Sequence, residues 1–351
     1  LAADFLKRDK KIDTNEVLYT RSMSNFEYVM GKTTGILRLF LGLDIIILLI
    51  GLLINIISKS MTIDLPSYLY YLLIICVPTL IFSLGLAFML MSVIRNQAIT
   101  FLFLLGIAAL NMFWLYYRFG SLFDYMAFGL PVFKSGITGY DNLSRILNQR
   151  LIYFFFGMSL VLATVLLFRR LPQSKPHTTI SAVLMIIFLA GTFITAYNTW
   201  SVYRGDINEK RIVIDTNREF ENSNFVSLKN ASIDFIHNKD RFEAAAKLEF
   251  VNNNHEDLNK YLFSLNPFLK VNSVTSKGKN MVYKTKHHII EVEPDSPLAP
   301  GESDTINISF SGSIDESFCY PDYSDDIKET PYRISNILNV NKRQAFLTED
   351  Y

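Results

Sequence analysis

The chain has 351 residues, of which 50% are hydrophobic, and its formal net charge is only +1. Together with a positive mean hydropathy of +0.22, this composition would be unusual for one soluble domain and fits a very apolar half joined to an ordinary polar half. The small net charge gives no reason to expect a nucleic-acid partner. Of the two cysteines, Cys76 falls in an apolar run and Cys319 in the polar half, so we expect no disulfide between them.

The two ends of the chain are abrupt. The first residue is Leu1, and residues 1–11 are mixed and charged, unlike a signal peptide with a basic start and an apolar centre. We therefore expect a piece of a longer protein that continues at both ends.

Five stretches are apolar for long enough to cross a bilayer, since a helix needs roughly 20 residues to span a hydrocarbon core about 30 Å thick. They are 34–57, 66–93, 98–117, 149–168 and 180–198. Pro78 lies near the middle of the second stretch and can kink it. The chain is therefore predicted to begin with a membrane all-α bundle of five transmembrane helices.

Lysine and arginine residues predict the orientation of these helices. Basic residues cluster before the first span, at Arg95 in the turn after the second, and in the linker 169–179 after the fourth. These segments fall on one side of the membrane, which should be the cytoplasm. The chain beyond 198 is then periplasmic or extracellular.

Two charged residues lie within the first span. Arg38 can extend to the cytoplasmic interface, whereas Asp44 is deeper, where an unpaired carboxylate costs several kcal/mol. Their spacing does not place them cleanly on one helix face, so each is expected to contact another helix. Arg38 and Asp44 are candidates for an intramembrane polar site in a transport path, with a purely structural contact between helices as the alternative.

The loop 118–148 is strongly apolar, yet Gly and Pro residues such as Gly129 and Pro131 interrupt it too often for a span. Non-helical backbone at membrane depth has to be sheltered by protein. We expect a re-entrant or interfacial loop between the third and fourth spans.

The stretch before the first span, DTNEVLYTRSMSNFEYVMGK, resembles the cytoplasmic segment of ABC exporter permeases that leads into the third transmembrane helix. An acidic-apolar run, a small-residue turn and an aromatic residue before Gly31-Lys32 carry the match, although Met23 stands where the family often has proline. The resemblance implies that 34–168 forms helices three to six of a six-helix permease, and that 1–33 is a cytoplasmic coupling segment.

In that family the coupling segment docks on an ATPase subunit. The residues implied here are Glu16, Val17, Leu18, Arg21, Phe26 and Tyr28. Because the chain has no G-x-x-x-x-G-K-[ST] loop, ATP would be bound by a separate subunit and no cofactor is expected in this chain. The expected partners are the lipid bilayer, an ABC ATPase subunit and a second copy in a homodimer.

From about residue 225 the apolar pattern changes to a period of two. Ala246, Leu248 and Phe250 alternate with polar residues, as do Ile306 and Ile308, and turn clusters separate such runs. This pattern predicts an extracytoplasmic all-β sandwich over 205–351. The additional helix 180–198 would carry the chain to that side of the membrane.

Four stretches of this half, Ala246–Asn252, Leu262–Val271, Leu298–Glu302 and Ile308–Ile314, resemble the N-terminal β-domain of gluzincin peptidases, the aminopeptidase N-like family. The resemblance implies a permease fused to a peptidase-like domain, an arrangement of the bacterial cytoplasmic (inner) membrane. A catalytic zinc aminopeptidase domain would then follow Tyr351.

The chemistry of such a peptidase is not expected within the chain itself. Zinc peptidases need H-E-x-x-H, whereas His255-Glu256 is followed by Asn259 where the second histidine would stand. His287 and His288 are adjacent in a predicted strand and should point to opposite faces. No catalytic, cofactor-binding or metal residue is therefore predicted.

Two functions remain open from the sequence. The first is a permease component of an ABC-type exporter with a fused, non-catalytic peptidase-like domain. The second is a membrane-anchored aminopeptidase-like or substrate-capture protein whose helices serve mainly as the anchor.

Overall fold

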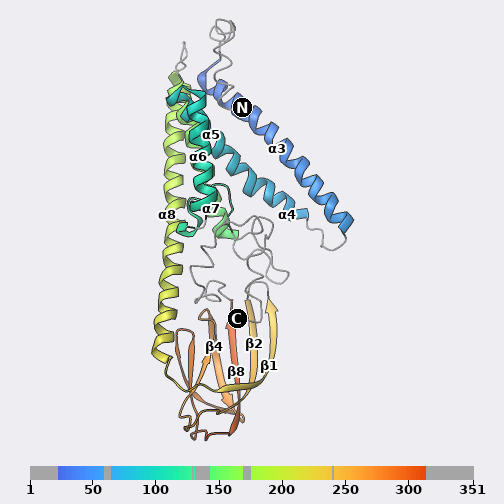
Figure 1. Ribbon diagram of the computed structural model, residues 1–351, viewed down its shortest axis with the longest axis vertical. Coiled ribbons are helices and arrows are strands. Elements are labelled where there is room, and N and C mark those ends of the chain that lie inside the picture. The colour runs from blue at the N-terminus through green and yellow to red at the C-terminus, as the bar shows by residue number, and fades with distance from the viewer. Residues whose placement is uncertain are drawn as a thin grey trace. The chain divides into compact units, whose positions relative to one another are not determined.

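The computed structural model describes residues 23–58, 65–116, 118–128, 130, 143–168, 175–238 and 241–313. The chain divides into two compact units, one helical and one built mainly of strands, and the division falls between Tyr203 and Arg204 (Figure 1). Each unit has its own hydrophobic interior.

Among the described residues, five helices are long and apolar enough to cross a membrane, as the sequence predicted, and the last of them continues from the helical unit into the second unit. Their elements are α3 (Asn25–Ser58), α4 (Leu65–Tyr70), η1 (Tyr71–Cys76), α5 (Val77–Ile94), α6 (Gln97–Leu110), η2 (Asn111–Leu115), α7 (Leu143–Leu167) and α8 (Lys175–Phe220). A short 3₁₀ turn, η3 (Arg118–Ser121), follows the third helix. The sides on which the helix ends lie remain predictions.

Pro78 has an effect on its own helix. The backbone between α4 and α5 widens into the π-helical turn η1, where the Val77 N–H donates to the carbonyl oxygen of Leu72. A proline has no N–H to donate, and its ring crowds the carbonyl four residues earlier. The wider turn directly before Pro78 accommodates both effects without ending the helix.

The closest helix packing joins α5 and α7. A Cβ atom on Gly85 would lie 2.5 Å from the carbonyl oxygen of Gly157, and a Cβ on Gly157 would lie 2.6 Å from the Cα of Phe82. The two backbones therefore touch where both helices have glycine. Small residues at such a crossing are the usual device of helix pairs in membranes, where packing replaces the hydrophobic effect.

Two helices extend beyond the predicted spans. The first, α3, starts at Asn25, because Ser24 and Glu27 form a capping box: the Glu27 N–H donates to Ser24 Oγ (3.2 Å) and the Ser24 N–H to Glu27 Oε2 (2.7 Å). The last, α8, runs to Phe220, so the expected β-domain begins with helix rather than strand at 205. No proline interrupts residues 199–220, and Val213 in this part is buried, which favours continuation of the helix.

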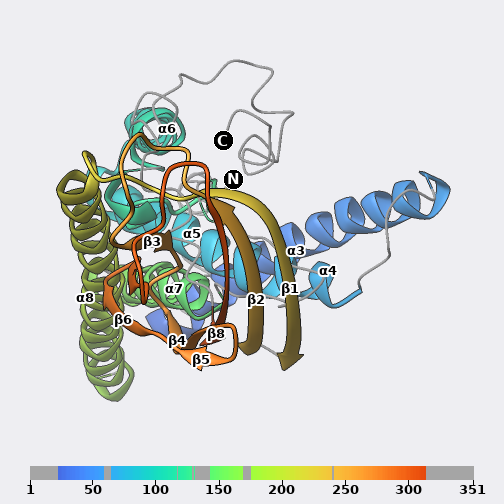
Figure 2. The ribbon, with the colours of Figure 1, turned by 90° about the horizontal axis from the view of Figure 1, so that it is seen from below.

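The second unit contains an antiparallel β-sandwich. Its strands are β1 (Ser227–Asn238), β2 (Arg241–Val251), β3 (Tyr261–Ser264), β4 (Leu269–Ser276), β5 (Lys279–Asn280), β6 (Val282–Lys286), β7 (Ile289–Glu293) and β8 (Ser303–Gly312). One sheet has the order β1-β2-β8-β4-β5 and the other the order β3-β7-β6. In Figure 2, β1 lies beside β2 at the edge of the larger sheet.

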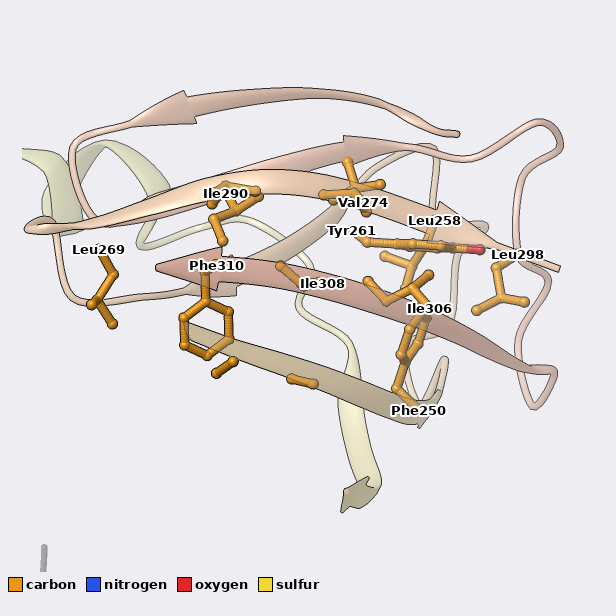
Figure 3. Packing of buried hydrophobic residues seen from close by; sticks show 14 residues of the cluster. Phe250, Leu258, Tyr261, Leu269, Val274, Ile290, Leu298, Ile306, Ile308 and Phe310 are labelled. Carbon is orange, nitrogen blue, oxygen red and sulfur yellow. The ribbon is translucent and has the colours of Figure 1, made fainter. Parts of the chain in front are cut away.

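The sandwich core consists of the alternating apolar side chains that the sequence predicted. Phe250 of β2 and Ile306 of β8 are fully buried, and the ring of Phe250 contacts that of Tyr261 from the other sheet, with centroids 4.8 Å apart (Figure 3). Tyr261 also donates a hydrogen bond to Asp304 (3.0 Å). Burial, followed by the nearby Asp304 carboxylate, raises the pKa of this phenol, so Tyr261 remains a hydrogen-bond donor.

Candidate functional site

The predicted coupling residues are only partly within the described chain. Glu16, Val17, Leu18 and Arg21 lie outside the described residues. Phe26 and Tyr28 lie in the first turns of α3. Their coupling role stays a prediction.

Both aromatic residues pack on the ends of other helices in the same unit. The ring of Tyr28 stacks on Phe168, which directly follows α7, with centroids 5.2 Å apart. The ring of Phe26 stacks on His177 in the first turn of α8 at 6.4 Å. The side chain of Asn25 donates to the carbonyl oxygen of Phe168 (2.7 Å). The start of α3 is therefore joined to the ends of two other long helices.

The structure does not bring Arg38 and Asp44 together. The side chain of Arg38 is exposed on α3, whereas Asp44 is half-buried and lies near the thiol of Cys76 in η1. A transport role for this pair remains a prediction. The principal polar site of the helical unit lies elsewhere, around two adjacent residues of α7.

Gln149 and Arg150 are each 1% exposed, which places an amide and a guanidinium inside the helical unit. They share a helix face with Ile146, Tyr153 and Gly157, all of which are buried. This helical spacing is visible in the sequence and could have indicated that Gln149 and Arg150 are buried. The predicted fourth span begins at 149, so both residues fall at its start, and neither was named as a candidate.

Arg150 binds main-chain and side-chain oxygens around it. Its Nη2 donates to the carbonyl oxygen of Asp124 (2.5 Å), and its Nη1 donates to the carbonyl oxygen of Tyr125 (3.0 Å) and to Thr79 Oγ1 (3.1 Å). Its Nε donates to Gln149 Oε1 (2.6 Å). A guanidinium presents its donors in a fixed planar fork, and here each nitrogen has an oxygen acceptor.

Gln149 and Tyr153 extend the same arrangement. Gln149 Nε2 donates to the carbonyl oxygens of Ser121 (2.8 Å) and Asp124 (2.9 Å), and Tyr153 Oη donates to that of Leu122 (2.7 Å). These carbonyls belong to the turns after the third helix, where some backbone groups also bond to one another, as from the Asp124 N–H to the carbonyl oxygen of Ser121 (3.1 Å). Side chains of α7 therefore satisfy backbone groups that a helix would satisfy internally.

The carboxyl group of this network belongs to Asp124, which is fully buried. Its Oδ1 accepts a hydrogen bond from Asn111 Nδ2 (3.3 Å), and Asn111 Oδ1 accepts one from the Met126 N–H (3.2 Å). Asn111 begins the π-helical turn η2, in which the Tyr116 N–H donates to the carbonyl oxygen of Asn111 (3.1 Å). The π-helical turn η2 therefore begins at a residue of this polar contact, and π-helical turns are frequent at functional sites.

The segment that this network holds has an unusual backbone. Phe119, Gly120 and Ser121 all have positive φ, at 53°, 61° and 60°. A Cβ on Gly120 would lie 2.7 Å from the ring of Tyr203 in α8, so this position requires glycine both for its φ and for its contact. Non-glycine residues in this conformation cost about 1–3 kcal/mol each and occur where the surroundings enforce them.

We refer to Thr79, Asn111, Asp124, Gln149, Arg150 and Tyr153 as the polar network. It can fix a non-helical segment inside an apolar bundle and can hold charge there. Within the described ranges, no group of three or more His, Cys, Asp and Glu side chains could hold a metal ion. The network offers hydrogen-bond donors and acceptors for binding and positioning.

No protein-family model and no curated protein matches the chain. Solved structures of the M1 zinc metallopeptidase from Deinococcus radiodurans, including a mutant bound to a Tyr-Ser-Ala substrate, match with a TM-score of 0.23 and 15% sequence identity. The match covers 25% of this chain and 20% of the metallopeptidase chain, and a two-domain M1 zinc metallopeptidase mutant bound to L-tryptophan gives the same values. A likeness of this extent says nothing about activity.

Proposed function

We propose that the helical unit is part of the membrane-spanning permease component of an ABC-type exporter of the bacterial cytoplasmic membrane. A separate subunit binds and hydrolyses ATP. The sandwich is a fused, extracytoplasmic, peptidase-like domain without catalytic residues of its own in this chain. The alternative is a membrane anchor for an aminopeptidase-like or substrate-capture protein.

The polar network is the observation that carries this proposal. A charged side chain inside an apolar bundle costs free energy unless it is paired, and such residues mark substrate paths or moving parts in membrane proteins. A helix bundle that only anchors a domain can be built from apolar helices in close packing, without a non-helical segment that a buried arginine has to hold. The network of Arg150, Gln149 and Asp124 therefore favours the permease over the anchor.

A second observation supports mechanical coupling. The start of α3 is fixed to the end of α7 through Tyr28 and Phe168, and to the start of α8 through Phe26 and His177. A partner that bound the chain just before Ser24 would act on three long helices at once. The same residues of an anchor would have no reason to be joined in this way.

The experiment is purification of the chain in mild detergent from its native host, followed by identification of bound proteins. We expect an ABC ATPase subunit in stoichiometric amount. Charge reversal in the predicted coupling segment, Glu16→Lys with Arg21→Glu, should remove that subunit, while Glu221→Lys in the other unit is the matched control. A complex that survives the double reversal unchanged would contradict the proposal.

A truncation separates the two functions. Removal of the chain after Phe220 leaves all five long helices but removes the sandwich. The permease account expects the ATPase subunit to remain bound to the truncated chain. If the truncated chain loses every partner and the sandwich alone retains them, the anchor is the correct description.

A further inference from the structure

The turn between β6 and β7 contains an arrangement that the proposed membrane function does not use. Lys286 pairs with Ile289, so His287 and His288 form a two-residue hairpin loop. His287 has a φ of 54°, although the first position of such a loop is one that glycine favours. The cost of placing a histidine there indicates that its side chain has a role.

The Nδ1 atoms of the two imidazoles approach each other with the ring planes at 85°, contrary to the expectation that adjacent strand residues point to opposite faces. Because the pair lies in the turn and not within a strand, Nδ1 of His287 is 3.2 Å from Nδ1 of His288. Two imidazole nitrogens that bind one tetrahedral zinc at 2.0–2.1 Å are about 3.3 Å apart. The observed separation is therefore close to that of two ligands on one metal ion.

The other nitrogen of each ring is directed to an oxygen acceptor on α8. His287 Nε2 lies 2.6 Å from Glu209 Oε1, and His288 Nε2 lies 2.7 Å from Asn217 Oδ1. Glu209 and Asn217 are eight residues apart on one face of α8, with the buried Val213 between them. All of these residues belong to the same compact unit.

Such acceptors orient metal-binding histidines in proteins. A histidine that ligates a metal donates its remaining N–H to a carboxylate or carbonyl oxygen, which fixes the tautomer and raises the basicity of the ligating nitrogen. With both Nε2 atoms as donors, both Nδ1 atoms present lone pairs to each other across 3.2 Å. Two lone pairs at that distance repel unless a cation lies between them.

We propose that His287 and His288 bind one divalent transition-metal ion of the zinc class through their Nδ1 atoms. Glu209 and Asn217 position the two rings, and water completes the coordination, since no third His, Cys, Asp or Glu ligand is present in the part of the chain that the structure describes. Imidazole nitrogen suits Zn²⁺, Cu²⁺ and Ni²⁺ and not Mg²⁺ or Ca²⁺. The ion would fix the two rings in the β6–β7 hairpin, and their hydrogen bonds to Glu209 and Asn217 would then hold the hairpin against α8.

The test is a Zn²⁺ titration of the whole chain in detergent, without a polyhistidine tag and after treatment with EDTA, against a chromophoric competing chelator. We expect one Zn²⁺ per chain, and visible absorption bands of bound Co²⁺ when cobalt replaces zinc. His287→Gly should weaken binding at least tenfold. This variant also suits the positive φ, so its loss of binding cannot come from a misfolded turn.

Two further variants sharpen the test. Glu209→Gln should reduce the affinity about 10–100-fold, because it weakens the orientation of His287 without removing a ligand. His255→Asn, in an exposed loop of the same unit, is the matched control and should leave the titration unchanged. Zinc binding that is absent, or that His287→Gly does not weaken, overturns the proposal; the two rings then share a proton as an imidazolium–imidazole pair.

Discussion

The two units of this chain both have an apolar interior, but they differ in the polar groups that they bury and in the apolar groups that they expose. The helical unit buries Arg150 and Gln149 at 1% exposure, while Ile57 and Phe193 on its long helices are 71% and 68% exposed. The strand-rich unit buries apolar side chains such as Phe250, which is fully buried, and has polar turns. In water the first arrangement would be unfavourable, whereas in lipid it places apolar groups outward.

This difference shows which interactions specify the structure of each unit. A sandwich core is held by burial of apolar area, and many combinations of apolar residues can fill it. The helical unit gains little from burying more apolar side chains, because lipid is apolar too, so close packing and hydrogen bonds decide its structure. The following predictions compare the two, from the largest expected effect to the smallest.

The largest effect is expected at Arg150. Arg150→Met should lower the free energy of unfolding of the helical unit by about 3–5 kcal/mol, because it removes the donor from the buried carbonyl oxygens of Asp124 and Tyr125 and from Gln149 Oε1. Unfolding in detergent micelles by added SDS measures this change. Arg38→Met, on the exposed face of α3, should change it by less than about 0.5 kcal/mol. If the two variants changed the free energy of unfolding equally, the buried polar network would contribute no more to stability than the exposed face of α3.

A comparable loss is expected in the sandwich, with a different cause. Phe250→Ala should destabilise that unit by about 3–5 kcal/mol, because it leaves a cavity against Tyr261. Phe235→Ala, at a side chain of β1 that is 63% exposed, is the control and should be almost neutral. Thermal unfolding followed by near-ultraviolet circular dichroism gives both values. A large loss at Phe235 would show that the edge strand is covered by other residues.

Two glycine-to-alanine substitutions in the helical unit should change its stability in opposite directions. Gly157→Ala should destabilise the α5–α7 pair by about 1–3 kcal/mol, since the new methyl group meets the backbone of Phe82. Gly106→Ala in α6, where a Cβ meets nothing within 4 Å, should stabilise its helix by up to about 1 kcal/mol. The same micelle unfolding assay applies. A stabilising Gly157→Ala would contradict the close approach of the two backbones.

The smallest effect concerns the start of α3. Ser24→Ala removes the cap on the Glu27 N–H and should cost about 1 kcal/mol. Ser201→Ala, within α8 and exposed, is the control and should be neutral or slightly stabilising. Hydrogen exchange of the amides of the first turn of α3 reports the change locally. Unchanged protection in Ser24→Ala would mean that tertiary packing alone fixes this end.

Local patterns predicted much of the architecture. The apolar runs predicted five helices long enough to cross a membrane, and the period of two predicted strands such as those around Ala246 and Ile306. The extended ends of α3 and α8 were not predicted, because the hydropathy criterion marks apolar length and not helix length. The capping box formed by Ser24 and Glu27 is visible in the sequence and could have predicted the start of α3.

The candidate site could not be predicted in the same way. The bonds from Gln149 and Arg150 to Asp124 join residues about 25 positions apart, and no local period encodes which partner a buried guanidinium finds. The contact between His287 and His288 depends on a turn at positive φ, where the strand pattern predicted opposite faces. Such sites depend on tertiary contacts that composition and spacing do not specify.

The most direct measurement of the proposed function is the ATP hydrolysis rate of the purified complex in lipid nanodiscs, with Arg150→Lys compared to the unmodified chain. The lysine keeps the positive charge near Asp124 but cannot bind the carbonyl oxygens of Asp124 and Tyr125 and Thr79 Oγ1 together. Arg204→Lys, at an exposed residue of α8, is the matched control. The permease account predicts a lower or uncoupled rate for Arg150→Lys alone; rates that are identical in all three complexes, or a chain that binds no ATPase subunit, would contradict it.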